Sequence, residues 1–428
     1  MKILQIIPGS GGSFYCGNCL RDSKYVEAIK KLGHEVTKIP MYLPLFDDER
    51  DITSEIPVFY GAISIYLKQM SPIFRKAPKW FDRFLNSKPM LKFAAKMAGS
   101  TRATGLEDMT ISMLQGEKGK QNEELERMVE WIADHYKPDI IHISNALLNG
   151  IAPRLKEATN APIVCSLQDE DVWIDPMEEK FQKESWGLME ANSEYIDAYI
   201  GVSEYYSKLI LEKMTIPKEK LHSLHIGVDP DDYDYSPDKA NPLNIGYISR
   251  MCHENGVDIA VDAFALLKKM DGFADTKLYL TGGQTGDDKE ILKQINKTIK
   301  QEKLTDSVIF QADFEKEGRT QFFNSVSFIS VPVRNGEAFG LYLLESMASG
   351  VPVVQPALGA FPEIIQLSGG GITYEPNTPE VLAETWAKLL KDQDKIAELA
   401  KNGRKGVEEH FNIFDQGKSL IKIYETLN

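Results

Sequence analysis

The stretch that most constrains the fold of this chain covers residues 325–355. Val326 to Val331 is a short, β-branched apolar run, which favours a buried parallel strand over a helix of that length. From Leu341 to Ser349 the apolar residues return at helical spacing, and Gly350 is placed to end the helix. Val351 to Gln355 predicts a second buried strand. Strand, polar loop, helix and strand form a parallel crossover unit, and the loop of such a unit lies at the carboxyl edge of the sheet, where ligands bind.

Two carboxylates belong to this unit. Glu337 lies in the loop and Glu345 follows eight residues later, in the helix. At about 100° per residue, Glu345 falls about 40° from Leu341 and borders the apolar face, so it needs a hydrogen-bonding partner. The backbone N–H groups at the helix start suit an anion, and a glycine lets the anion approach closely. The pattern predicts a site for a ligand with hydroxyls and phosphate, lined by Ala338, Phe339, Gly340 and Leu341.

The sequence from Glu337 to Glu345, E-A-F-G-L-Y-L-L-E, followed by Gly359-Ala-Phe-Pro-Glu363, resembles the E-x7-E signature of glycosyltransferase family 4. The resemblance implies a GT-B architecture, with two Rossmann-like, doubly wound parallel-sheet α/β domains facing a cleft. It also implies a retaining enzyme that uses a nucleoside-diphosphate sugar. In that family the first glutamate, here Glu337, serves the donor sugar hydroxyls, and the second, here Glu345, serves the ribose.

Other donor-binding residues follow from the same resemblance. The segment Arg250-Met-Cys-His-Glu-Asn255 resembles the family's diphosphate segment, in which an arginine and, five residues later, a lysine neutralise the donor. Here the second position is Asn255, which donates a hydrogen bond but carries no charge. Gly282 follows a predicted strand in a loop of the kind that meets the nucleoside. Gly11 and Gly12 follow the first predicted strand, where family members hold donor or acceptor.

The acceptor side departs from the family pattern. Relatives commonly carry a histidine at the end of the strand predicted here for Ile163 to Leu167, but this chain has Gln168. Asp169 is then the nearest candidate for acceptor-side chemistry. The resemblance therefore implies three catalytic candidates, Glu337, Asp169 and Gln168. It further implies front-face attack with the leaving phosphate as base, with neither a divalent metal nor a cofactor beyond the sugar nucleotide.

We expect an N-terminal acceptor-side domain over 1–235, a C-terminal donor domain over 236–410 and a terminal helix over 411–428 that crosses back. Asp229 to Pro242 is acidic and proline-bearing, which favours a hinge. With 428 residues and 43% hydrophobic content, the chain is long enough for two domains with proper cores.

Charge and cysteine content exclude other classes. A net charge of −14 argues against nucleic-acid binding. Four cysteines are too few for a disulfide scaffold, which favours a reducing, cytoplasmic compartment. Cys16-Gly-Asn-Cys19 favours two reduced cysteines at a helix start over a redox pair or half a zinc site, since no second pair follows at usable spacing. No window approaches 18 consecutive apolar residues, so we expect no membrane span.

The doubly wound pattern is interrupted between about 45 and 122, where we expect a helical insertion. Within it, residues 63–102 hold nine basic side chains and one acidic side chain, with aromatic and aliphatic residues between them. Two interpretations stay open. One is contact with an anionic membrane surface or a lipid-linked acceptor, at the inner face of the membrane. The other is an insertion packed on the first domain with a solvated basic face.

The predicted activity is transfer of a sugar to a hydroxyl of a glycan or a lipid-linked acceptor of the cell envelope. Two alternatives from other classes remain. The first is a non-catalytic scaffold of the same fold, in which Gln168 and Asn255 mark lost chemistry. The second is a sugar-nucleotide epimerase or a phosphorylase on a similar two-domain frame.

Overall fold

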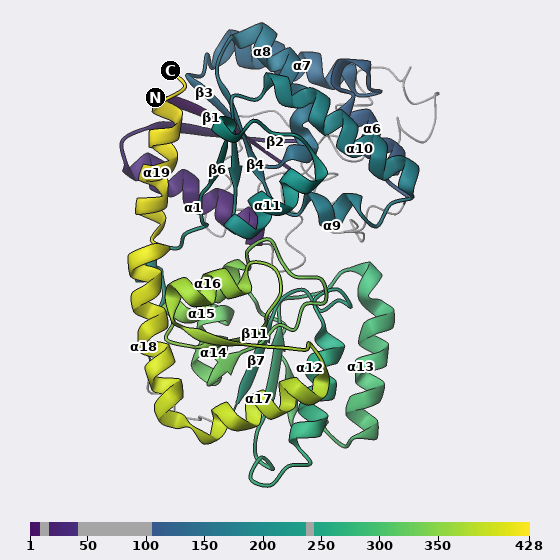
Figure 1. Cartoon of the computed structure of the whole chain (residues 1–428), viewed down its shortest axis with the longest axis vertical. Helices are drawn as coiled ribbons and strands as arrows, with labels where there is room; N and C mark the ends of the chain where they lie inside the picture. The colour runs from purple at the N-terminus through teal and green to yellow at the C-terminus, as the bar shows by residue number, and fades with distance from the viewer. Residues whose placement is uncertain (9–16, 42–104, 237–243) are drawn as a thin grey trace. The chain divides into compact units, whose positions relative to one another are not determined.

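The computed structural model describes residues 1–8, 17–41, 105–236 and 244–428 (Figure 1). Some features singled out in the sequence lie outside the described residues. They are the predicted basic insertion at 63–102, the glycines Gly11 and Gly12, and Cys16. The chain divides into two compact units. Of the described residues, 1–8, 18–41, 105–225 and 416–428 belong to the first unit, and 226–236 and 244–415 belong to the second. The predicted hinge, Asp229 to Pro242, begins shortly after the first of these division points.

The first unit is built on a six-stranded sheet in the order β2-β1-β3-β4-β5-β6, with all neighbours parallel. The strands are short, and the first five are largely buried, as expected for a sheet covered by helices. The order reverses between β1 and β3, which creates a switch point of the doubly wound kind. Their bounds are β1 (Lys2–Ile7), β2 (Glu35–Pro40), β3 (Ile140–Ile143), β4 (Ile163–Leu167), β5 (Ala198–Gly201) and β6 (Leu221–Ser223).

Local signals set where the helices of the first unit begin and end. The first helix carries Lys30 and Lys31 in its last turn, and Gly33 follows with φ 90°, so the chain turns where only glycine is unstrained. The Ser203 side chain caps α11 by accepting from the Tyr206 N–H. The helices are α1 (Gly17–Lys31), α6 (Glu107–Leu114), α7 (Asn122–His135), α8 (Ala152–Thr159), α9 (Glu170–Ile174), α10 (Glu179–Asn192), α11 (Glu204–Lys213) and α19 (Ile413–Glu425).

The terminal helix α19 packs on the first unit (Figure 1). The Tyr424 hydroxyl lies 2.5 Å from Nδ1 of His142 on β3, and His142 Nε2 lies 2.8 Å from Oγ of Ser166 on β4. Burial lowers the pKa of His142 to about 3, so this ring is neutral at physiological pH. One ring nitrogen therefore joins the helix to the sheet, and the other joins two neighbouring strands.

The second unit also has a six-stranded parallel sheet, in the order β12-β11-β10-β7-β8-β9. The chain runs from β7 to one edge and then from β10 to the other, so the switch point lies between β7 and β10. The bounds are β7 (Ile245–Ile248), β8 (Leu278–Thr281), β9 (Val308–Phe310), β10 (Phe328–Ile329), β11 (Val353–Pro356) and β12 (Gly371–Tyr374).

Seven helices are described in the second unit, and all eight residues of α15 are buried. This confirms that Glu345 does not point fully to solvent. The helices are α12 (Val257–Leu267), α13 (Lys289–Gln301), α14 (Lys316–Ser325), α15 (Leu341–Ala348), α16 (Phe361–Ser368), α17 (Pro379–Lys391) and α18 (Gln393–His410).

Two strands are shorter at one or both ends than the sequence predicted. The strand expected over Val326 to Val331 is reduced to Phe328–Ile329, because the Val331 N–H turns to the Gln355 side chain at 3.0 Å. The strand expected from Val351 begins at Val353, because the Val351 N–H bonds the Ser346 carbonyl at 2.9 Å and closes the end of α15. In both cases a loop hydrogen bond replaces a ladder bond.

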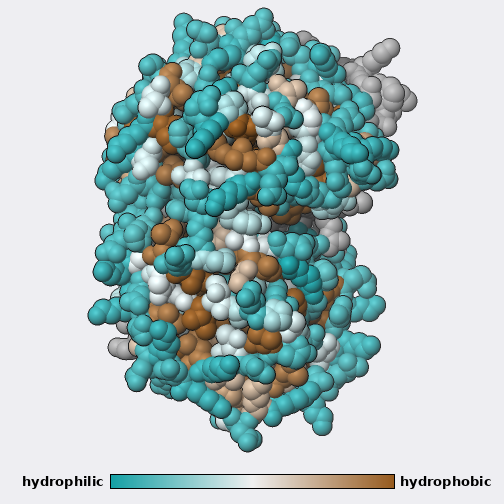
Figure 2. Space-filling view, viewed as in Figure 1, coloured by the Kyte–Doolittle hydropathy of each residue, from teal (hydrophilic) through white to brown (hydrophobic). Residues whose placement is uncertain are grey.

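On the face shown in Figure 2, hydrophilic side chains predominate over both units, and apolar ones gather in smaller groups. Among the helices of the described ranges, none combines the length and the apolar character that crossing a bilayer requires.

Candidate active site

The loop before α15 is shaped by glycines. Gly340 is the N-cap residue of α15 with φ 93°, and as a glycine it has no side chain with which to cap the helix. Gly336 and Gly359 also have positive φ, and a Cβ on Gly359 would lie 2.4 Å from the Glu337 nitrogen. The Ala360 N–H donates to the Glu337 carbonyl at 3.0 Å. The loop is thus held against the start of α16, with the amide groups of the first turn of α15 at its end.

Glu337 is half-buried in this loop. Its Oε2 accepts a 2.6 Å hydrogen bond from the hydroxyl of Tyr342, in the first turn of α15. The carboxylate is therefore oriented by the helix that it precedes. Sequence reasoning missed Tyr342, although its spacing of five residues from Glu337 was visible.

Glu345 has the hydrogen-bonding partners that its position on α15 requires. Its side chain is 1% exposed, and Oε1 accepts from the Tyr233 hydroxyl at 2.9 Å and faces Nε of Arg319 at 3.3 Å. Arg319 is itself held by the Phe314 carbonyl at 3.0 Å. These two donors fix the orientation of the buried carboxylate.

Arg250 follows β7 at the switch point and forms a two-bond ion pair with Asp288. Nε lies 2.9 Å from Oδ2 and Nη2 lies 2.7 Å from Oδ1. Asp288 is fully buried, and the Thr285 N–H and hydroxyl also donate to it. Burial raises the pKa of Asp288, but the hydrogen bonds from Arg250 and Thr285 outweigh burial and hold that pKa below its usual range. The guanidinium is therefore fixed relative to α13.

Asn255 and Gly282 complete the loops around Arg250. Asn255 Nδ2 donates to Ser249 Oγ at 2.8 Å and to the Arg250 carbonyl at 3.3 Å. Gly282 has φ 114°, and a Cβ there would lie 2.3 Å from the Ser249 carbonyl oxygen. Asn255 closes its own loop, and Gly282 allows the loop after β8 to lie against the end of β7. A contact between Asn255 and phosphate stays a prediction.

The structure therefore brings one set of predicted residues together in the second unit. Most of them follow the strands β7, β8 and β10, which are neighbours at the switch point. Two of them, Leu341 and Glu345, lie in α15, the helix of the crossover unit. The residues are Arg250, Asn255, Gly282, Glu337, Ala338, Phe339, Gly340, Leu341 and Glu345. Such an arrangement suits a ligand with an anionic part near the helix start and hydroxyls near the two glutamates.

The two acceptor-side candidates lie in the first unit, after β4. Gln168 is 3% exposed: its Oε1 accepts from the Arg21 guanidinium, and its Nε2 donates to the Ser144 carbonyl at 2.8 Å. Both ends of this amide are bound within the unit. Asp169 is half-buried and has φ 57°, a left-handed conformation that Asp adopts more readily than most residues.

A buried carboxylate that sequence reasoning missed supports this loop. Glu170 is 0% exposed, and it accepts from the Ala146 N–H at 2.9 Å, the Gln168 N–H at 2.7 Å and the Tyr206 hydroxyl at 2.7 Å. The same hydroxyl lies 2.9 Å from Asp171 Oδ1, and one phenolic proton serves only one carboxylate at a time. Burial raises the pKa of Glu170 to about 7 and also raises the pKa of Asp171.

Two doubly wound parallel sheets, with the predicted ligand loops at strand ends near their switch points, define the GT-B class of two-domain α/β proteins. Two family profiles match the sequence. The one described as Glycosyl transferases group 1 covers residues 234–406, and the one described as Glycosyltransferase Family 4 covers residues 116–232. Together they match more than half of the chain, which belongs to glycosyltransferase family 4.

Similar proteins agree with this assignment. A lipopolysaccharide core biosynthesis mannosyltransferase of Rhizobium meliloti is 26% identical over 187 residues, which cover 43% of this chain and 51% of that protein. The N-acetyl-alpha-D-glucosaminyl L-malate synthase of Bacillus anthracis is 25% identical over 311 residues, covering 69% and 76%. Among solved structures, HepE of Anabaena in complex with UDP-glucose aligns with a TM-score of 0.68 at 15% identity, covering 100% of both chains. That structural likeness concerns the fold.

Proposed function

We propose that this protein is a retaining glycosyltransferase that moves a sugar from a nucleoside-diphosphate sugar to a hydroxyl acceptor. The observation that carries the proposal is the position of Glu337 and Glu345 on either side of the start of α15, where Gly340 is the N-cap residue, at the switch point of the second unit. One carboxylate precedes the helix start and the other is buried one turn beyond it. This arrangement fits a ligand in which a sugar, a diphosphate and a ribose follow one another.

In this proposal the charge that develops on the departing diphosphate is stabilised by groups that are already in place. Arg250 is oriented by Asp288, and the first-turn amides of α15 add the positive end of the helix dipole. Glu337 accepts from donor sugar hydroxyls and Glu345 accepts from the ribose. The leaving phosphate removes the proton from the attacking hydroxyl on the same face of the sugar, so the anomeric configuration is kept and no divalent metal is required.

The acceptor is proposed as a glycan or a lipid-linked molecule of the cell envelope. The lipopolysaccharide core relative supports this class, and so does the charge of residues 63–102, nine basic side chains against one acidic. If this stretch meets a membrane, the protein should co-sediment with anionic liposomes at low salt and be released as salt rises. No binding at low salt would end the membrane part of the proposal.

The donor is tested first by a thermal-shift screen with UDP, GDP and ADP and their sugars, because a ligand that binds only the folded state raises the melting temperature. Transfer assays with the donors that bind, followed by NMR of the product's anomeric proton, then test for retention. Glu337→Ala should abolish transfer while the melting temperature stays near that of the wild type. Glu302→Ala removes an exposed glutamate of the same unit and should leave transfer unchanged.

The alternatives give different results. A non-catalytic scaffold would fold but show neither donor hydrolysis nor transfer with the whole panel. An epimerase would change the donor when no acceptor is added. An undiminished rate in Glu337→Ala would remove that residue from the site.

A further inference from the structure

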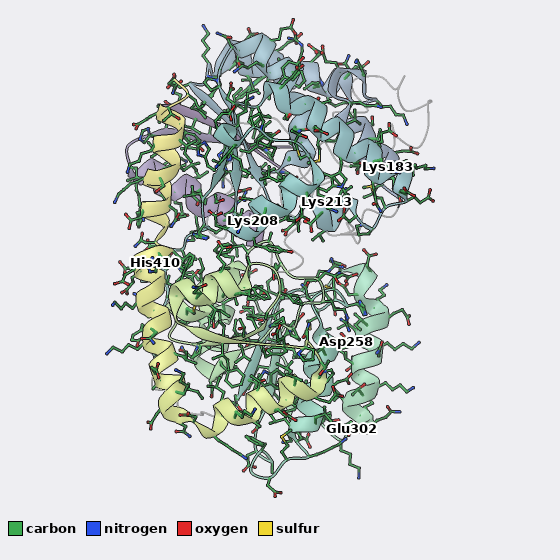
Figure 3. The ribbon with its side chains drawn as sticks, in the orientation of Figure 1. Lys183, Lys208, Lys213, Asp258, Glu302 and His410 are labelled. Carbon is green, nitrogen blue, oxygen red and sulfur yellow. The ribbon has the colours of Figure 1, made fainter. Side chains whose placement is uncertain are left out.

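The loop that carries Glu337 is joined to the start of α12, the helix after β7, by an ion pair that the proposed chemistry does not use. Arg334 lies three residues before Glu337, in the segment that we call the glutamate loop (residues 332–340). Its guanidinium forms an ion pair with Asp258, the second residue of α12. Asp258 is labelled in Figure 3. Nη1 lies 3.0 Å from Oδ1 and Nη2 lies 2.6 Å from Oδ2. This fork-to-fork geometry fixes both the distance and the angle between the two segments.

Backbone contacts reinforce the same junction. The Arg334 N–H donates to the Glu254 carbonyl at 3.0 Å, and the Arg334 guanidinium donates to the His253 carbonyl. Gly256 has φ 68°, and a Cβ there would lie 2.0 Å from the Pro332 carbonyl oxygen. Residues 253–258 and 332–334 are therefore in direct contact, backbone against backbone.

These two segments belong to different parts of the proposed donor site. Arg250 and Asn255 lie in the segment after β7, on the diphosphate side. Glu337 lies three residues beyond Arg334, on the sugar side. A junction between them sets how far the diphosphate group is held from the sugar-binding carboxylate.

An exposed ion pair in the same unit provides a comparison. Lys269 and Glu302 lie 2.8 Å apart, with side chains 62% and 37% exposed, whereas those of Arg334 and Asp258 are 25% and 12% exposed. Exposed pairs contribute little, because water and salt screen them. The Arg334–Asp258 pair is less exposed, forked and supported by backbone bonds, so we expect it to hold its two segments together more firmly than the exposed pair holds its own.

We propose that Arg334 and Asp258 are positioning residues of the donor site, which hold the diphosphate-binding loop and the glutamate loop at a fixed separation. The inference rests on the proposed function, since it assigns the pair a role in binding the donor. Neither residue is assigned a contact with the reacting atoms.

The test compares Arg334→Lys, Asp258→Asn and the double variant with the control double variant Lys269→Met/Glu302→Gln. Lysine keeps the charge of Arg334 but not its fork, and asparagine keeps the shape of Asp258 but not its charge. Calorimetry measures binding of the nucleoside diphosphate and of the donor found in the thermal-shift screen, and steady-state kinetics give kcat and KM separately. Thermal melting of each variant reports on folding.

Each single variant should lower kcat/KM by about tenfold or more, because a displacement of about 1 Å between reacting groups has effects of this size. Binding of the nucleotide sugar should weaken more than binding of the nucleoside diphosphate. The double variant should be no worse than the worse single variant, because both substitutions break the same pair. The control double variant should stay within about twofold of the wild type, as expected for an exposed pair.

Three results would overturn the inference and leave the proposed function standing. The first is a kcat/KM of the single variants that matches that of the control double variant. The second is a double variant whose loss of kcat/KM is the product of the two single losses, and the third is loss of cooperative melting in the variants while the control keeps it. The last result would make the pair a requirement for folding. A wild-type protein that binds no nucleotide sugar would overturn the proposed function itself, and the positioning role with it.

Discussion

The hydroxyl of Tyr342 donates a 2.6 Å hydrogen bond to Oε2 of Glu337, so the first turn of α15 orients the carboxylate that precedes it. Tyr342 is 1% exposed, and its ring is anchored in the second unit. The helix that presents amide groups to the proposed diphosphate thus also sets the carboxylate proposed for the sugar.

Tyr342→Phe should therefore impair catalysis more than folding. Removing one hydrogen bond to a charged group costs about 1.5–3 kcal/mol where that bond is required, which corresponds to a loss of roughly ten- to a hundredfold in kcat/KM. Kinetics on the purified variant measure the loss, and its melting temperature should remain within a few degrees of the wild type. Unchanged kinetics would mean that Glu337 is held by other contacts.

Asp288→Asn should destabilise the protein and weaken nucleotide binding together. The substitution leaves Arg250, whose side chain is 13% exposed, without its charged partner and weakens the capping box with Thr285. Breaking a buried pair from one side costs about 3–5 kcal/mol, and partial exposure places this case at the lower end. Urea denaturation gives the stability, and calorimetry with the nucleoside diphosphate gives the affinity. Tighter binding by the variant would show that Asp288 opposes the anion instead of orienting Arg250.

Glu170 should make stability depend on pH. Its pKa is raised by burial from 4.5 to about 7, so between these values the folded protein binds a proton that the unfolded chain has released. The resulting stabilisation is complete below pH 4.5 and is lost as pH rises through about 7. Glu170→Gln removes this titration. The free energy of unfolding of the wild type, relative to Glu170→Gln, should fall between about pH 4.5 and about pH 7. A difference that does not change with pH would contradict the raised pKa.

Tyr424→Phe should loosen the terminal helix. The change removes the hydroxyl that bonds His142 and leaves a buried imidazole nitrogen without this partner, at a cost of about 1–3 kcal/mol. Hydrogen exchange should show faster exchange in α19, and urea denaturation should show lower stability. Because Tyr424 and His142 both lie in the first unit, binding of nucleoside diphosphate should be unaffected. If it weakens, the terminal helix influences the second unit.

Much of the proposed donor site was predictable because its signals are local. Glu337 and Glu345 stand eight residues apart on one loop and helix, and the glycine between them marks the helix start. Parallel strands at buried apolar runs follow from the same short-range patterns, whereas Arg250 was singled out by the resemblance to the family's diphosphate segment. Strand ends were less accurate, since Val331 and Val351 use their N–H groups on loop partners that no local pattern reveals.

The sequence by itself determined the strand, loop and helix around the start of α15, because helix periodicity, strand periodicity and glycine placement act over a few neighbouring residues, and the resemblance of the E-x7-E signature added the class of fold. Only the tertiary structure decided how those residues are held. Three pairs of hydrogen-bonded side chains are far apart in the sequence. Glu345 and Tyr233 are separated by 112 positions, Arg334 and Asp258 by 76, and Gln168 and Arg21 by 147. A buried charge or amide requires a hydrogen-bonding partner, but the fold determines which residue that partner is. The identity of the partner cannot be read from residue spacing or composition.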